Sequence, residues 1–264
     1  MNSFSQVAVF VREAGKIGVD SQLRINFHDR EYKDDGSVVT ATDRAIEDFL
    51  CDRIGKVISG CNFVTEERSR TFREDADLTF VIDPIDGTDN FSNGMHNWSI
   101  SVGLLDAKMN PIAGIVYAPR LDLFLFADVG KPACIGPARL YPPVPVPGLT
   151  KLSGIMMSSK IHQQLDMTKY PGKARALGST ALHLCMPAVY QSVVGAIQDN
   201  RAFAWDIAGA HAVLASLGCE IRYFNGQEVS YSDMKSNGWR VSDFIVAGKP
   251  GAPSHLMECI RKIS

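Results

Sequence analysis

The feature that most constrains this chain is an apolar run that leads directly into paired carboxylates. Leu78–Ile82 has the composition of a buried strand, and Asp83-Pro84-Ile85-Asp86-Gly87-Thr88 follows it at once. We expect Pro84 to end the sheet pairing and Gly87 to allow a sharp turn. Two carboxylates held this close repel each other unless a cation lies between them, and Mg2+ prefers carboxylate, water and phosphate oxygens. The segment therefore predicts a metal site for phosphate chemistry, although Asp-Pro and Asp-Gly are also common turn dipeptides.

Composition and charge exclude several classes of protein. The chain has 264 residues, of which 45% are hydrophobic and 21% charged, which is typical of a globular protein built from two packed subdomains or one large α/β unit. Its net charge of −2 gives no general basic field, so we expect neither nucleic acid nor a membrane as a partner. The six cysteines form no CxxC pair, which argues against structural zinc and disulfides and favours a cytoplasmic location.

The first half of the chain has the pattern of an antiparallel sheet covered by two helices. Apolar residues recur at helical spacing over 4–23, which predicts an amphipathic first helix there. A second helix is expected to begin near Thr42 or Asp43, either of which would serve as its N-cap, and to reach Val57. Strands are predicted over 62–65, 78–82, 98–105, 112–117 and 121–127.

A proline-rich segment separates this half from the next. Residues 131–148 hold six of the thirteen prolines, which excludes regular helix and central strand. We interpret them as a semi-rigid connector between subdomains at 1–130 and 149–264, with a ligand for a proline-recognition domain as the alternative. Beyond the connector, strands over 154–157, 193–197, 220–223 and 244–247 alternate with helices over 180–190, 206–217 and 254–262, which predicts an α/β layer.

Further acidic residues strengthen the metal hypothesis. Glu66 and Glu67 follow the apolar strand over 62–65, and Asp43 and Asp206 stand at predicted helix starts. A carboxylate at a helix start is often only a cap, so neither aspartate is decisive alone. Taken with the paired carboxylates after Ile82, however, the set predicts one acidic cluster.

Four ordered motifs resemble those of the inositol monophosphatase family, whose members are Mg2+-dependent, lithium-sensitive phosphatases. They are Val39-Thr40-Ala41-Thr42-Asp43, Glu66-Glu67, Asp83-Pro84-Ile85-Asp86-Gly87-Thr88-Asp89-Asn90 and Trp205-Asp206-Ile207-Ala208-Gly209-Ala210. The resemblance covers nearly the whole chain and implies an α/β fold of the layered αβαβα sandwich type, and a homodimer. It also implies two or three Mg2+ ions, held by Glu66, Asp83, the carbonyl of Ile85, Asp86 and Asp206.

The resemblance implies roles for other residues as well. Thr88 and Glu66 would orient the attacking water, and Asp43 would support Thr88. Gly87 and Thr88 would begin a helix whose free N–H groups bind the substrate phosphate. The other residues that it places at the substrate are Gly178, Ser179, Thr180, Asp199 and Lys33, with Asp199 accepting hydrogen bonds from sugar hydroxyls.

These observations predict a Mg2+-dependent phosphomonoesterase that acts on a small polyol phosphate through a metal-activated water. Inositol monophosphate is the first candidate, because a carboxylate at Asp199 suits vicinal hydroxyls and repels a second phosphate unless Arg201 or Lys160 offsets it. Thr65 and Asp89 depart from the family pattern and leave the substrate open. The alternatives are a 3′(2′),5′-bisphosphate nucleotidase, a fructose-1,6-bisphosphatase-like sugar phosphatase and a catalytically silent interaction protein.

Overall fold

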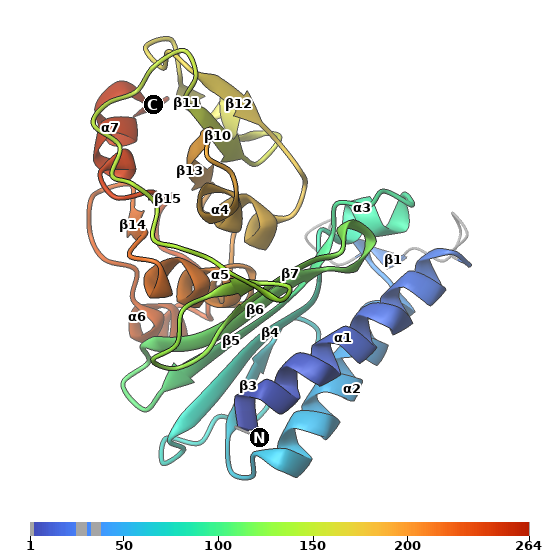
Figure 1. The fold of residues 1–264 in the computed structure, drawn as a ribbon. Coiled ribbons are helices and arrows are strands. Elements are labelled where there is room, and N and C mark those ends of the chain that lie inside the picture. The colour runs from blue at the N-terminus through green and yellow to red at the C-terminus, as the bar shows by residue number, and fades with distance from the viewer. Residues whose placement is uncertain (1–2, 25–30, 33–37, 264) are drawn as a thin grey trace.

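The chain folds into five alternating layers of helix and sheet (Figure 1). The computed structural model describes residues 3–24, 31–32 and 38–263. Helices α1 (Ser3–Gln22) and α2 (Ala41–Val57) form the first layer, and a seven-stranded sheet forms the second. Helices α4 (Thr180–Val189) and α5 (Ala204–Ser216) separate that sheet from a five-stranded one, whose outer face carries α7 (Ala252–Cys259). The layered α/β sandwich expected from the sequence is therefore confirmed.

The first two helices cover one face of the large sheet because each has an apolar stripe. Phe4, Val7 and Val11 of α1 are buried in one cluster with Ile46 and Leu50 of α2. Burial of these side chains fixes the two helices against the sheet.

The predicted N-cap of α2 was wrong by two to three residues. Thr40 is the cap: its backbone is extended and its hydroxyl accepts a hydrogen bond from the Thr42 N–H at 3.2 Å. Asp43 lies in the first turn, and its carboxylate accepts from the Thr40 N–H at 2.9 Å. Thr40, Thr42 and Asp43 are all residue types that can cap a helix, and only the reciprocal hydrogen bonds between Thr40 and Asp43 show which of them is the cap.

The seven-stranded sheet runs in sequence order. Its strands are β3 (Asn62–Thr65), β4 (Leu78–Asp86), β5 (Ser99–Asp106), β6 (Pro111–Ala118), β7 (Leu123–Ala127), β8 (Cys134–Ile135) and β9 (Ala138–Arg139). The pair β3 and β4 is parallel, and every other neighbouring pair is antiparallel. The five strands predicted in this half are present, each within a few residues of its expected bounds.

The expectation that Pro84 ends sheet pairing was wrong. Strand β4 continues to Asp86, with Asp83 opposite Ser101 and Asp86 opposite Ser99 of β5. The register shifts between these two pairs, so that Pro84 and Ile85 together face one residue of β5. A bulge of this kind absorbs the missing proline N–H and bends the strand without ending it.

The second sheet is mixed and has the order β12-β10-β13-β15-β14. Its strands are β10 (Gly154–Met157), β12 (Lys173–Arg175), β13 (Val193–Gln198), β14 (Glu220–Tyr223) and β15 (Ile245–Gly248). Strand β10 is parallel to β12 and β13, whereas β15 is antiparallel to β13 and β14. The four strands predicted in this half are all in this sheet.

The last predicted helix was too long. Helix α7 ends at Cys259, and β16 (Arg261–Lys262) then pairs with β11 (Leu165–Asp166). The shorter elements are β1 (Glu31–Tyr32), β2 (Val38–Val39), α3 (Thr88–Ser92), α6 (Tyr231–Ser236) and the 3-10 turns η2 (Pro119–Leu121) and η3 (Ile161–Gln163). Of these, only the helix start at Thr88 was expected.

The proline-rich segment contributes to both halves of the chain. Strands β8 and β9 lie within 131–148 and extend the edge of the large sheet. Farther along, the Val146 N–H donates to the Pro250 carbonyl at 2.8 Å, just before α7. The division into 1–130, 131–148 and 149–264 stays a prediction.

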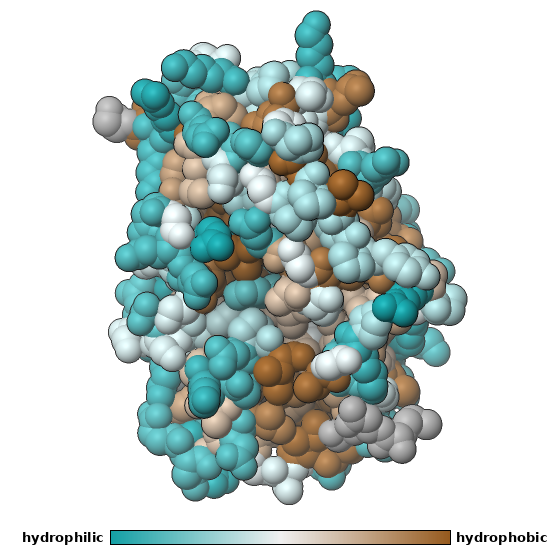
Figure 2. Space-filling model, turned by 60° about the vertical axis from the view of Figure 1, so that its left-hand side comes forward, coloured by the Kyte–Doolittle hydropathy of each residue, from teal (hydrophilic) through white to brown (hydrophobic). Residues whose placement is uncertain are grey.

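The surface is mixed in character. The face shown in Figure 2 is mostly hydrophilic, with apolar side chains gathered in its lower half. No helix in the described part of the chain is both long and apolar enough to cross a membrane.

Candidate active site

Three aspartates from distant parts of the chain meet between the two sheets. Asp83 and Asp86 flank the bulge of β4, and Asp206 lies in the first turn of α5. One carboxylate oxygen from each of the three can be chosen so that all lie within 4.8 Å of one another. The fold thus brings together three members of the acidic cluster predicted from the sequence.

The cluster is electrostatically unfavourable without a cation. Burial, followed by the charges of Glu66, Asp86 and Asp206, raises the pKa of Asp83 well above its ordinary value. Burial and the charges of Asp86 and Glu66 raise the pKa of Asp206 in the same way. Glu66, which follows β3, therefore adds its negative charge to the cluster.

The donor set fits a hard divalent cation. Within the described ranges, no lysine or arginine forms an ion pair with Asp83, Asp86 or Asp206. The available ligand atoms are carboxylate oxygens, which Mg2+ prefers and which soft metals do not. The three carboxylates could therefore hold a metal ion that offsets their repulsion.

Hydrogen bonds fix the orientation of the Asp86 and Asp206 carboxylates. Asp86 Oδ2 accepts from the Ala181 N–H at 2.8 Å and from the Ser179 hydroxyl, and Asp86 Oδ1 accepts from the Thr180 N–H at 3.0 Å. These contacts bind β4 to the start of α4. Asp206 Oδ2 accepts from the Phe203 N–H at 2.6 Å, so this aspartate also caps its own helix. Asp206 can therefore cap α5 and also be one of the carboxylates that could hold a metal ion.

Thr88 lies beside the cluster and joins it to Asp43. Its hydroxyl oxygen is 2.9 Å from the Ile85 carbonyl oxygen and 3.2 Å from Asp43 Oδ1, both of which are acceptors. The hydroxyl has one proton to donate, so its lone pairs remain able to accept from another donor. Burial raises the pKa of Asp43 to about 6, although hydrogen bonds from Thr40 oppose the rise. The expected contact between Asp43 and Thr88 is present.

Two glycines allow the loops around the cluster to approach closely. Gly87 has φ 92° and Gly178 has φ 88°, a region that disfavours other residues. A Cβ on Gly178 would lie 2.3 Å from Asn90 Nδ2. Asn90 needs that space, because its amide donates to the carbonyls of Leu177 at 2.7 Å and Asn97 at 2.6 Å.

His183 holds the same loop from the other side, a role that the sequence did not reveal. Its Nε2 accepts from the Leu177 N–H at 2.6 Å, and Gln198 contacts its Nδ1 at 2.7 Å. Burial lowers the pKa of His183 to about 4, so the ring is neutral at physiological pH. The only sequence signal was a single histidine within a long uncharged run.

A pocket of about 540 Å³ opens beside the acidic cluster. Its lining includes Glu66, Thr180 and Asp206, together with Gln198, Asp199 and residues 201–203. Ser179 is fully buried and donates to Asp86, so its side chain supports the cluster. Lys33, which was expected near the site, lies outside the described residues.

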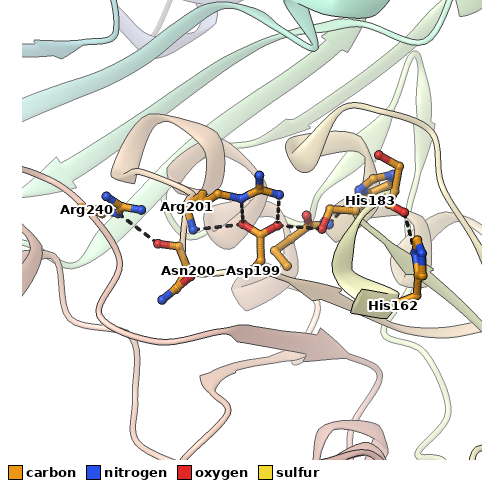
Figure 3. A network of polar contacts seen from close by, with 9 residues as sticks. His162, His183, Asp199, Asn200, Arg201 and Arg240 are labelled. Atoms are coloured by element: carbon orange, nitrogen blue, oxygen red, sulfur yellow. Dashed lines mark hydrogen bonds and ion pairs between the residues drawn. The ribbon is translucent and has the colours of Figure 1, made fainter. Parts of the chain in front are cut away.

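Asp199 lines this pocket, but protein donors already occupy its carboxylate (Figure 3). Arg201 reaches it through Nε at 3.1 Å, Nη2 at 2.6 Å and the backbone N–H at 3.0 Å. The Ser158 hydroxyl donates to Oδ2 at 3.1 Å. Burial raises the pKa of this carboxyl, but the hydrogen bonds and charge of Arg201 hold it below its ordinary value. Asp199 is therefore an ionised partner of Arg201, and the role of binding sugar hydroxyls stays a prediction.

Comparison with known proteins agrees with this geometry. The chain is 26% identical to an inositol-1-monophosphatase of Mesorhizobium japonicum over 243 residues, covering 87% of this chain and 85% of the relative. It is 27% identical to the Nus factor SuhB of Pasteurella multocida, covering 100% and 96%. The solved Thermotoga maritima IMPase superposes with a TM-score of 0.82 at 23% identity, covering 98% and 96%, and so shares the fold. The model of the inositol monophosphatase family matches residues 4–261, and the chain therefore belongs to that family.

Proposed function

We propose that the protein is a Mg2+-dependent phosphomonoesterase that hydrolyses a small phosphorylated polyol. The observation that carries the proposal is the convergence of Asp83, Asp86 and Asp206 beside an open pocket, with no ion pair to neutralise them in the described part of the chain. We assign Glu66 and the Ile85 carbonyl to the same ligand set, for two or three ions. Bound Mg2+ would polarise the phosphoryl oxygens and acidify a water.

The residues around the ions would position that water. The Thr88 hydroxyl donates either to Asp43 or to the Ile85 carbonyl, so it would accept a hydrogen bond from the water. Asp43 in turn is held by the capping box at Thr40. Glu66 would accept the second hydrogen bond of the water. This arrangement aims a lone pair of the water at the phosphorus and supplies orientation, which typically contributes about 10²- to 10⁴-fold in rate.

The substrate phosphate would lie over Gly87 and Thr88, with the rest of the molecule in the pocket lined by Thr180 and Asp199. Family membership places inositol monophosphate first in a test panel, with nucleoside and sugar bisphosphates as alternatives. A homodimer, lithium sensitivity and a cytoplasmic location stay predictions.

Release of inorganic phosphate tests the proposal. We expect turnover with Mg2+ of at least one phosphate among inositol, hexose and nucleoside phosphates, and loss of turnover in excess EDTA. Phosphate release from none of them at saturating Mg2+ would contradict the proposal and favour a catalytically silent interaction protein.

A further inference from the structure

We propose that the pocket beside the acidic cluster binds a second anionic group, so that the preferred substrates are bisphosphates. This inference rests on the proposed function and names the substrate class of the same site. Three cationic side chains line the pocket together with the acidic residues: Lys160, Arg201 and Arg240. Of the acidic residues in the pocket lining, Asp199 is paired with Arg201, whereas Asp206 and Glu66 contribute charge to the aspartate cluster.

The pair of Asp199 and Arg201 is turned so that its positive end faces the solvent. The Asp199 side chain is 7% exposed, whereas the Arg201 side chain is 55% exposed. Four donors already cover the carboxylate, so it presents little acceptor capacity to a substrate. The guanidinium has five N–H donors, and only two of them are used on Asp199. The pair is formally neutral, yet what it offers to the pocket is hydrogen-bond donors.

Arg240 and Lys160 add positive charge that no carboxylate of the described residues pairs with. Both side chains are exposed, and neither forms an ion pair with a residue that the structure describes. Arg240 is held in place by a hydrogen bond from Nε to the Asn200 carbonyl at 3.1 Å, and its guanidinium lies 5.8 Å from the centre of the Phe203 ring. Figure 3 shows Arg240 and Arg201 on neighbouring parts of one network. Lys160, Arg201 and Arg240 together with Asp199 carry a formal charge of +2.

A phosphate group complements this surface better than neutral hydroxyls do. Guanidinium groups bind phosphate oxygens through short, charge-assisted hydrogen bonds that are about twice as strong as neutral ones. A neutral polyol would meet mainly donors here, because the acceptor atoms of Asp199 are occupied. The cavity of about 540 Å³ has room for a hexose or nucleoside that places one phosphate at the aspartates and the other at the cations.

Matched substrate pairs isolate the second phosphate. We would measure kcat/KM for fructose 1,6-bisphosphate against fructose 1-phosphate, and for adenosine 3′,5′-bisphosphate against adenosine 3′-phosphate. We expect at least a tenfold preference for the bisphosphate in one pair, and that pair identifies the sugar or the nucleoside as the source. We also expect the preference to shrink as the salt concentration rises, since the second contact is charged and partly exposed.

Two variants and a control assign the preference to these side chains. Arg240→Gln and Lys160→Gln should each lower the ratio of the two kcat/KM values by up to about tenfold, which is the effect of losing one charge-assisted hydrogen bond. Arg139→Gln removes an exposed arginine of β9 on the far edge of the other sheet and should leave the ratio unchanged. Thermal unfolding of each variant verifies that it is folded.

The outcomes separate this inference from the proposed function. Equal kcat/KM values within both pairs, or a preference that survives when Arg240→Gln and Lys160→Gln are combined in one protein, would overturn the second-anion site while leaving the phosphatase proposal standing. Phosphate release from no substrate would instead contradict the proposed function itself.

Discussion

Replacing Asp43 by asparagine should change how the stability of the metal-free protein depends on pH. Burial raises the pKa of Asp43 from 3.8 to about 6 in the folded protein. The folded state therefore favours the protonated carboxyl, and the ionised form is destabilising. The stability that the protonated Asp43 carboxyl contributes is complete below pH 3.8 and is lost as the pH rises through about 6. The shift corresponds to about 3 kcal/mol in the free energy of unfolding.

The asparagine variant lacks this titration but keeps the shape of the side chain. Its amide oxygen can accept from Thr88 or from the Thr40 N–H but not from both, so the variant loses one hydrogen bond at every pH, and this constant offset does not change the trend. Between pH 4 and pH 7.5 we expect the free energy of unfolding of the variant, relative to wild type, to rise by about 2 kcal/mol. Titrating groups that do not interact with Asp43 are common to both proteins, so their effects cancel in this difference, whereas Asp83, whose pKa the Asp43 charge raises, contributes to it.

Urea unfolding in excess EDTA at pH 4, 5, 6 and 7.5 measures the difference directly. Asp52→Asn, which changes an exposed carboxylate of α2, is the matched control and should show no such trend. Stability curves of Asp43→Asn and wild type that stay parallel over this range would refute the argument that burial controls this carboxyl.

Three further predictions concern the site. Thr88→Ala should lower kcat by about 10²- to 10⁴-fold at saturating Mg2+ while leaving the Mg2+ concentration for half-maximal activity nearly unchanged. Thr88→Ser, which keeps the hydroxyl, should recover most of the rate. An altered metal requirement at a normal rate would contradict the role given to Thr88. Gly178→Ala should destabilise the fold by about 1–3 kcal/mol in thermal or urea unfolding, because φ is positive and the new Cβ would meet Asn90; unchanged stability would contradict this. Ca2+ should support little turnover in place of Mg2+, since it takes longer bonds and more ligands, and equal rates with the two ions would argue against an octahedral site.

Much of the fold could be predicted because its sheets leave a clear apolar pattern. The strands over 62–65, 111–118 and 154–157 follow from runs of apolar and β-branched residues. The continuation of β4 past Pro84 could not be predicted, because the bulge depends on pairing with β5. Helix α6 was missed because it has six residues and forms around the burial of Tyr231 and Met234.

The acidic residues of the site could be predicted because their types and local motifs specify the chemistry. Their mutual arrangement depends on the fold: Thr88 and Asp43 meet although they are 45 residues apart. The partner of Asp199 lies two residues away, yet the sequence does not tell whether Arg201 covers its carboxylate or points elsewhere. Arg240 was missed because its contact with the Asn200 carbonyl joins residues 40 positions apart.

Calorimetric titration of Mg2+ tests the central claim most directly, because it measures the metal site without relying on turnover. We predict binding of two or three ions by the wild-type protein, with Asp206→Asn losing at least one of them and nearly all phosphate release while remaining folded. Asp52→Asn should bind and turn over like wild type. Unchanged Mg2+ binding and near wild-type turnover in Asp206→Asn would contradict the claim that this cluster is the catalytic metal site.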